Sequence, residues 1–293
     1  MNQKLKNYHL LAGIHTISIR TPEPLEVPRA YKNVVNSVSN NKEERVHTSK
    51  LNLNKITTNI YEYSQFQACL ETLLDSAGVT DYEIIRADLR FDMFKQEEYE
   101  LFAKIHRYVI SLLATQYRVN NTYKTFDLFS QKQLSVAIKN KYFECENYDK
   151  EVQSHGHDAA AGRLEIRSKC LKTRDLKKVF MQDWDRRWEK ALAGIDAVND
   201  KYNEELERLY KEGMNAFPTE FRSLTDFLIQ YGSCIFNREQ MIDLIRRTDN
   251  TVSNPAKRVN NFKQKYGVDF YTEEDIRIVI NEIKRARTQY FNS

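Results

Sequence analysis

Residues 85–93, Ile-Arg-Ala-Asp-Leu-Arg-Phe-Asp-Met, carry an apolar side chain at every odd position and a charged one at every even position. A period of two is that of a β-strand, whose successive side chains point to opposite faces of a sheet. The apolar members therefore predict one face that packs on a core. Arg86, Asp88, Arg90 and Asp92 share the other face, which we expect to be exposed and charged.

Further strands are predicted on both sides of this segment. Residues typical of strands lie at 9–20, 133–144 and 163–168. The last of these segments also alternates, so that Glu165 shares a face with Arg163 and Arg167. Polar and turn-forming residues predict a loop at 32–48 and a loop or hairpin at 148–162.

Helices are predicted where apolar residues recur at helical spacing. Only 8 glycines and 5 prolines are available to interrupt them. The expected helices cover residues 64–76, 96–119, one or two between 173 and 214, 239–247, one beginning at 255, and 276–291. The predicted class is α+β: a central, mostly antiparallel sheet with flanking helices over residues 1–172, followed by an all-helical region over residues 173–293.

Composition narrows the cellular setting. Of the 293 residues, 41% are hydrophobic, which is enough for a large core, and the net charge of +4 permits a polyanionic partner. No stretch has the length and apolar character of a signal peptide or a membrane span. The four cysteines are scattered without metal-binding or disulfide spacing and are interpreted as reduced thiols. We expect a cytoplasmic protein that does not contact a membrane.

Carboxylates that alternate with arginines suit a divalent cation that meets a phosphate. Carboxylate oxygens are ligands that Mg²⁺ and Mn²⁺ prefer, and guanidinium groups bind phosphate oxygens. If the two charged strands pair in one sheet, Asp88 and Glu165 come together, and a bound cation or the flanking arginines would relieve their repulsion. The alternative is a solvated strand face held by cross-strand salt bridges.

Three segments occur in a fixed order: IRADLRFD at 85–92, ENYDKE at 146–151 and GRLEIRSK at 162–169. Together they resemble the plasmid rolling-circle replication initiators of the Rep-trans type, over about residues 80–172. The resemblance implies a tyrosine that attacks a phosphodiester at the plasmid origin. The protein then stays on the 5′ end, and the free 3′ hydroxyl primes DNA synthesis.

Carried onto this chain, the resemblance implies Tyr148 as the nucleophile, with Lys150 stabilising the phenolate or the phosphate charge. Tyr142 is the rival, because residues 138–142 (IKNKY) are partly similar to the tyrosine motif of some members. We prefer Tyr148, whose Tyr-Asp-Lys-Glu context is intact.

The same resemblance implies a cofactor and partners. The implied ligands of Mg²⁺ or Mn²⁺ are Asp88, Glu165 and Asp92. The strand arginines expected to contact DNA are Arg86, Arg90, Arg163 and Arg167. A homodimer and a host helicase are further expected partners. Among the histidines, His155 and His157 form either an auxiliary metal site with Asp158 or a solvated loop, whereas His15 and His106 are interpreted as core or surface residues.

Residues 239–268 predict a helix-turn-helix. A polar turn at 248–252 separates two helices, and Ser253 or Asn254 is the expected N-cap before Pro255. The second helix presents side chains of the types that read base edges: Lys257, Arg258, Asn260, Asn261 and Lys263. The alternative is an ordinary amphipathic surface helix.

A second basic segment, at residues 172–190, is a candidate track for a DNA backbone. Trp184 and Trp188 within it are more typical of a core. The leading hypothesis is thus an initiator that nicks origin DNA. The alternatives are a mobilisation relaxase with the same chemistry, and a non-catalytic origin-binding or regulatory protein.

Overall fold

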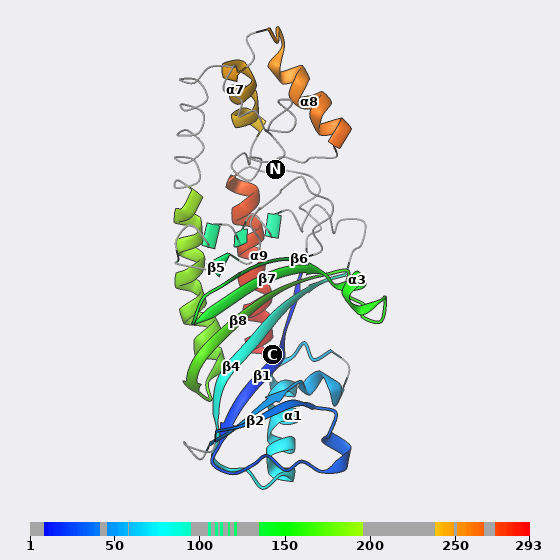
Figure 1. Cartoon of the computed structure of the whole chain (residues 1–293), viewed down its shortest axis with the longest axis vertical. Helices are drawn as coiled ribbons and strands as arrows, with labels where there is room; N and C mark the ends of the chain where they lie inside the picture. The colour runs from blue at the N-terminus through cyan, green and yellow to red at the C-terminus, as the bar shows by residue number, and fades with distance from the viewer. Residues whose placement is uncertain are drawn as a thin grey trace.

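The computed structural model describes residues 9–41, 46–57, 59–94, 135–195, 238–248, 251–266 and 273–293, with short pieces at 105–106, 109–110, 112–113, 117 and 120–121. Within this part of the chain the strands form one curved sheet (Figure 1). Their order is β2-β3-β1-β4-β8-β7-β6-β5, and every neighbouring pair is antiparallel. The predicted α+β class with a mostly antiparallel sheet is confirmed.

The described strands and helices have the following bounds. The strands are β1 (Leu11–Thr21), β2 (Val35–Asn41), β3 (Val46–Leu51), β4 (Glu83–Met93), β5 (Asn120–Asn121), β6 (Ser135–Lys139), β7 (Phe143–Asp149) and β8 (Gly162–Thr173). The helices are α1 (Tyr63–Ser76), α3 (Lys150–Ser154), α4 (Leu176–Lys178), α7 (Arg238–Thr248), α8 (Pro255–Tyr266) and α9 (Glu273–Asn292). A π-helical turn, η4 (Val179–Asp183), continues α4 into a helix that runs through residue 195.

Two of the sequence expectations about strands are wrong. The hairpin β2–β3 occupies most of the segment 32–48, which was expected as a loop. Its first strand, β2, lies at the sheet edge, and the side chains at 36–39 are exposed. Because neither face of this strand is buried there, its sequence does not show the apolar alternation by which a strand is recognised.

The segment 133–144, expected as one strand, contains a turn between β6 and β7. The Asn140 side chain makes this turn, because its Oδ1 accepts hydrogen bonds from the backbone N–H groups of Tyr142 and Phe143, both at 2.8 Å. Strand β7 then continues through Tyr148, which therefore lies on a strand and not in the expected loop.

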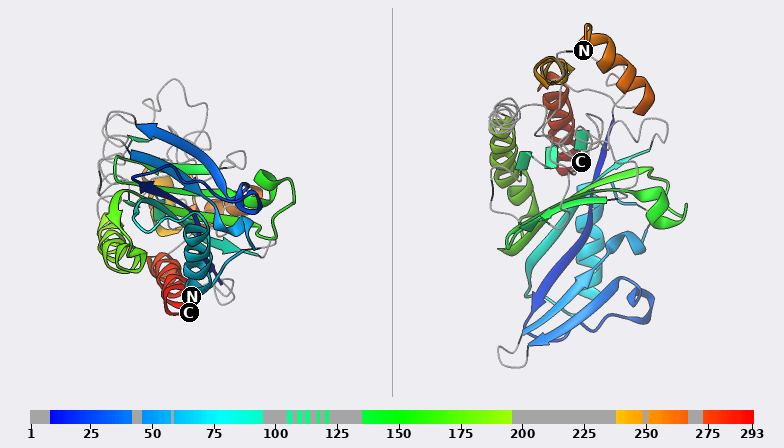
Figure 2. Two further views of the ribbon diagram at one scale, coloured as in Figure 1. Left: turned by 90° about the horizontal axis from the view of Figure 1, so that it is seen from below. Right: turned by 45° about the horizontal axis from the view of Figure 1, so that its top comes forward.

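The apolar face of β4 packs on helices. Ala87, Leu89 and Phe91 are buried, as predicted, whereas a β-bulge moves Ile84 into the core in place of the expected Ile85. Helix α1, helix α9 and the helix through residue 195 lie together on this side of the sheet (Figure 2). Trp184 and Trp188 belong to this core, as their residue type favoured.

The last helix joins the two ends of the described chain. Helix α9 packs against β1 and α1, and the Leu10 backbone N–H donates to Glu282 Oε1 at 2.9 Å. The predicted helix 96–119 is described only in part: residues 105–106, 109–110 and 112–113 are helical and buried. The domain boundary at 172/173 stays a prediction.

Gly13 in β1 leaves room for the backbone of a crossing segment. A Cβ at this position would lie 2.4 Å from the Ile60 carbonyl oxygen and 3.5 Å from Arg90 Nε. We expect Gly13→Ala to destabilise the protein by about 1–3 kcal/mol, because the backbone of residue 60 must shift. Thermal unfolding followed by circular dichroism measures this. An unchanged melting temperature would contradict the packing described here.

Candidate active site

Across β4 and β8 the charged side is arranged so that opposite charges face each other, whereas across β8 and β7 Glu165 faces Glu146 and Arg167 contacts both carboxylates. Across β4 and β8, Asp88 pairs with Arg167, Arg90 with Glu165, and Asp92 with Arg163. Directly opposed carboxylates would repel, and the register of β4 against β8 avoids them. Asp88 and Glu165 are consequently diagonal neighbours on adjacent strands.

This side of the sheet is not solvent-exposed as expected. Asp88 is 3% exposed and Asp92 is fully buried. The segment between β3 and α1 lies over β1 and the Asp92 end of β4. Its Asn54 side chain accepts a hydrogen bond from Arg90, and the Tyr61 ring lies 5.0 Å from the Arg90 guanidinium. The sequence gives no sign of this cover, because the alternation of β4 records only which residues share a face.

Asp92 is held entirely by neighbouring side chains. Arg163 donates to both of its oxygens, at 2.5 and 3.1 Å, and the Tyr61 hydroxyl donates to Oδ2 at 2.9 Å. Arg90 Nε forms a further ion pair at 3.1 Å. Burial would lower the pKa of Arg163, but the charge of Asp92 and its hydrogen bonds raise it well above its usual value. Asp92 and the two arginines thus form a buried, charge-paired cluster.

Glu165 is the centre of a second cluster that contains the predicted nucleophile. Its Oε1 accepts a hydrogen bond from the Tyr148 hydroxyl at 3.1 Å and lies 2.7 Å from His15 Nδ1. Its Oε2 accepts from Arg167 Nε at 3.0 Å and from Nη2 at 2.5 Å. Burial would raise the pKa of Glu165, but His15 and Arg167 outweigh it and hold this pKa well below its usual value. Glu165 is therefore a stable buried carboxylate.

His15 reaches this cluster because of a β-bulge in β1. In the pairing with β4, Ile14 faces Leu89 and Thr16 faces Asp88, so His15 is the extra residue of the bulge. Its side chain extends past β4 to Glu165 on β8. Sequence reasoning missed this role. The sequence does contain a signal for the bulge. Ile14 and Ile17 are both buried but lie three residues apart, which breaks the alternation of a regular strand.

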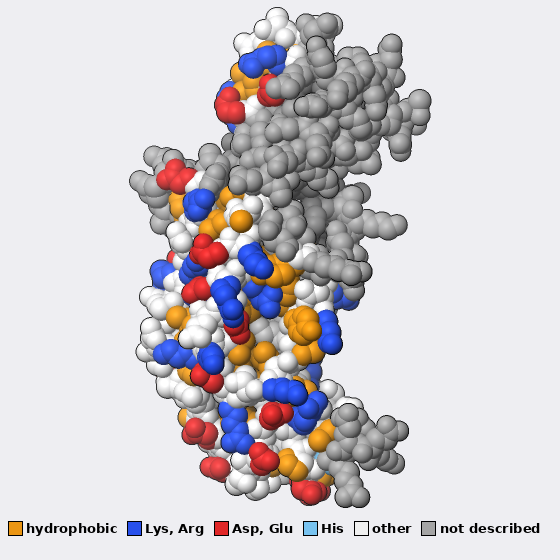
Figure 3. All heavy atoms as spheres, turned by 90° about the vertical axis from the view of Figure 1, so that its left-hand side faces the viewer, with side chains coloured by type: hydrophobic (Ala, Val, Ile, Leu, Met, Phe, Trp, Pro, Cys, Tyr) orange, Lys and Arg blue, Asp and Glu red, His pale blue; other side chains and the backbone are white. Residues whose placement is uncertain are grey.

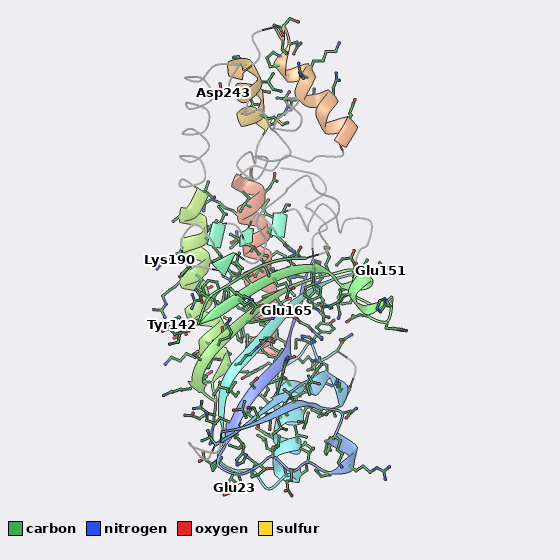
Figure 4. All side chains as sticks on the ribbon, in the orientation of Figure 1. Glu23, Tyr142, Glu151, Glu165, Lys190 and Asp243 are labelled. Carbon is green, nitrogen blue, oxygen red and sulfur yellow. The ribbon has the colours of Figure 1, made fainter. Side chains whose placement is uncertain are left out.

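Tyr148 and Tyr142 differ sharply in their surroundings. Burial first, and then the charge of Glu165, raise the pKa of the Tyr148 phenol well above its usual value. Tyr142 is 56% exposed and lies six residues away, at the other end of β7, or about 20 Å at the rise of a strand. Figure 4 shows Tyr142 at one end of the sheet and Glu165 near its middle. The structure thus brings Tyr148, and not Tyr142, to Glu165.

Lys150 begins α3 directly after β7. The Asp149 side chain caps this helix by accepting from the Val152 N–H at 2.9 Å. Lys150 Nζ lies 6.0 Å from the centre of the Tyr148 ring and 3.7 Å from Asp158 Oδ2. Burial lowers the pKa of Lys150. The ammonium group is therefore near the phenol ring but paired with a carboxylate.

The implied metal ion can be tested against these contacts. Within the ranges described above, no three His, Cys, Asp or Glu side chains are gathered to hold a metal. This also leaves His155 and His157 as residues of the loop after α3. Asp88 and Glu165 remain as two carboxylates on adjacent strands, and Mg²⁺ is often held by one or two carboxylates plus water and substrate phosphates. The pair fits such an ion only if Arg86, which donates to both Asp88 oxygens at 2.8 and 2.9 Å, and Arg167, which donates to Glu165 Oε2, release these oxygens.

The predicted helix pair is present as α7 and α8. Asn254 is the N-cap of α8, because its Oδ1 accepts from the Lys257 N–H at 2.9 Å. Met241 and Ile245 of α7 and Val259 of α8 are buried. Lys257, Arg258, Asn260 and Asn261 are exposed on α8, and the side chain of Lys263 lies outside the described residues. Helix α8 therefore presents a polar, basic surface, as predicted.

The chain has a distant match among solved structures. No family model matches the chain, and no curated protein is similar to it. A solved structure described as a rolling circle replication initiator protein from Geobacillus stearothermophilus is 13% identical, over 55% of this chain and 74% of that one, with a TM-score of 0.30. This score is too low to establish a common fold, so the functional argument rests on the residues.

Neutral substitutions of the two carboxylates should have different effects on stability. Burial raises the pKa of Asp88 despite Arg86, so folding disfavours its charge at neutral pH, whereas folding favours the charge of Glu165. We expect Glu165→Gln to cost about 2 kcal/mol, and Asp88→Asn to leave stability unchanged or to raise it. Urea unfolding at neutral pH measures both.

The deficit of Glu165→Gln should also depend on pH. A depressed pKa contributes stability that is present above the ordinary glutamate value of 4.5 and is lost as the pH falls toward the folded value. The difference between wild type and Glu165→Gln should therefore shrink below pH 4.5. A difference that grows in acid would contradict the contacts assigned to Glu165.

Proposed function

We propose that the protein nicks DNA at a replication origin and initiates rolling-circle replication, with Tyr148 as the nucleophile. The observation that carries this proposal is the hydrogen bond from the Tyr148 hydroxyl to the buried carboxylate of Glu165. The motif resemblance implies Tyr148 within reach of Asp88 and Glu165, and this contact, with Asp88 diagonal to Glu165 on the neighbouring strand, supports that arrangement.

In the proposed reaction the Tyr148 oxygen attacks the phosphorus of a phosphodiester. The new bond joins the phenol oxygen to phosphorus, and the bond from phosphorus to the 3′ oxygen breaks. The 3′ oxygen leaves as a hydroxyl after taking up a proton. The phosphotyrosine ester keeps a bond of the same type, so a later hydroxyl can reverse the step.

Proton transfer from Tyr148 to Glu165 is unfavourable in the site as it stands. Glu165 is the group positioned to accept the phenol proton, yet the pKa of Tyr148 is raised and that of Glu165 is lowered, and both shifts oppose the transfer. A divalent cation held by Asp88 and Glu165 would supply positive charge that favours the phenolate and neutralises the phosphate. Asp92 is left out of this proposal because Arg163, Arg90 and Tyr61 occupy its oxygens.

Two arginines would exchange partners when DNA arrives. The side chain of Arg86 is 30% exposed, and that of Arg167 is 16% exposed. Each can turn from a carboxylate to a DNA phosphate, which guanidinium groups bind in the same forked geometry. Arg90 and Arg163 are buried around Asp92 and have no such freedom.

Helix α8 is proposed to bind the origin, since it exposes Lys257, Arg258, Asn260 and Asn261. A non-catalytic origin-binding protein is the second candidate. It is favoured by the arginine contacts that occupy Asp88, Asp92 and Glu165, because a purely structural charged face would have the same pairing. A mobilisation relaxase would use the same site. A homodimer, a host helicase and a plasmid as the host element remain expectations of the resemblance.

Replacement of Tyr148 tests the catalytic proposal. With Mg²⁺ or Mn²⁺ and supercoiled or single-stranded origin DNA, wild type should give a covalent protein–DNA product that is visible by denaturing electrophoresis. Tyr148→Phe should abolish it, and Tyr142→Phe should retain it. If wild type forms no covalent product, the non-catalytic candidate is favoured. If Tyr148→Phe still cleaves and Tyr142→Phe does not, the choice of nucleophile is wrong.

Replacement of Lys257 tests the role of α8. Each phosphate contact releases about one counterion, so Lys257→Ala should lower the slope of log affinity against log salt by about one. Filter binding to origin duplex over a series of salt concentrations measures this slope. Arg29→Ala, an exposed change on a different element, is the matched control. An unchanged slope for Lys257→Ala would exclude that phosphate contact.

A further inference from the structure

Tyr142 is presented to solvent in a fixed position. Of the large hydrophobic side chains in the described chain it is the most exposed, at 56%. Its backbone is held on both sides: the N–H donates to Asn140 Oδ1 at 2.8 Å, and its carbonyl accepts from the Lys169 N–H at 2.7 Å. The ring is thus exposed, while two hydrogen bonds hold its backbone in place.

One cationic group lies at this ring, and a second lies on the helix that runs through residue 195. Lys141 Nζ lies 5.5 Å from the centre of the Tyr142 ring. The next residue, Phe143, contacts the Tyr117 ring at 5.2 Å, and Lys190 Nζ lies 5.1 Å from that second ring. Among the described residues, neither Lys141 nor Lys190 forms an ion pair. Their charges therefore remain available to an anion.

The two lysines and the tyrosine share one side of the molecule. Figure 4 shows Tyr142 and Lys190 on the same side, and the space-filling view of that side shows Lys and Arg side chains between apolar ones (Figure 3). This side is at the opposite end of β7 from Tyr148, so it does not overlap the proposed site of cleavage.

We propose that Lys141, Tyr142 and Lys190 form a binding surface for single-stranded DNA. An exposed ring can stack on a base only where the base is unpaired, and the lysines bind the phosphates on each side. The proposal extends the proposed function, because displacement of the strand cut at Tyr148 would produce unpaired DNA, and Tyr142 lies about 20 Å from Tyr148 along β7. It also gives Tyr142 a role that does not require its hydroxyl.

The test measures binding rather than cleavage. Fluorescence anisotropy with the full chain and a labelled oligothymidylate of about 16 nucleotides reports affinity, in the absence of divalent metal. Tyr142→Ala should weaken binding about tenfold, and Tyr142→Phe should bind like wild type, because stacking needs the ring alone. Lys141→Glu and Lys190→Glu should also weaken binding. Arg29→Glu, the same charge change at an exposed site elsewhere, should not.

Several results would overturn the proposal. These are wild-type affinity for Tyr142→Ala, a loss in Tyr142→Phe as large as in Tyr142→Ala, or an equal loss of affinity for the fully paired duplex. Circular dichroism confirms that each variant is folded. Failure of the proposed function is a separate outcome. If Tyr148→Phe still forms the covalent product, the choice of nucleophile is wrong. The anisotropy measurements alone decide whether the binding surface exists.

Discussion

The structure depends on the pairing of charges on a buried sheet face. A carboxylate or guanidinium taken out of water must find an opposite charge and enough hydrogen bonds. The register of β4 against β8 provides this, since each carboxylate of one strand faces an arginine of the other. A slip by one residue would exchange this face with the apolar core. The charge pattern therefore helps to fix the register as well as the site.

The two ends of this face differ in what they can do. Around Asp92 both arginine partners, Arg90 and Arg163, are buried, so that end is a structural cluster. Around Asp88 and Glu165 two of the partners, Arg86 and Arg167, keep access to solvent, and a third is a phenol. A site that exchanges arginine contacts for substrate contacts needs such partly exposed partners. The buried cluster around Asp92 and the proposed site at Asp88 and Glu165 are thus separated along one pair of strands.

The sequence predicted the features that depend on local patterns. The alternation of 85–93 identified β4 and its two faces, and Pro255 after Ser253 or Asn254 identified the start of α8, where the structure selects Asn254 as the cap. It did not predict the burial of the charged face, because Asn54 and Tyr61 reach it only through the tertiary fold. His15 was missed for a related reason: a bulge changes where one side chain points without changing the composition of the strand.

The packing of α9 on β1 has a consequence for the order of folding. The Leu10–Glu282 contact joins residues 272 positions apart, so the core is completed only after nearly the whole described chain has emerged. In chain order, α7 and α8 come after the core helix that runs through residue 195 and before the core helix α9. The unit is therefore joined to the core at both of its ends. Removing this unit would require a linker that closes the gap between residue 195 and α9. A truncation from the C-terminal side would instead remove α9, which packs against β1 and α1 in the core.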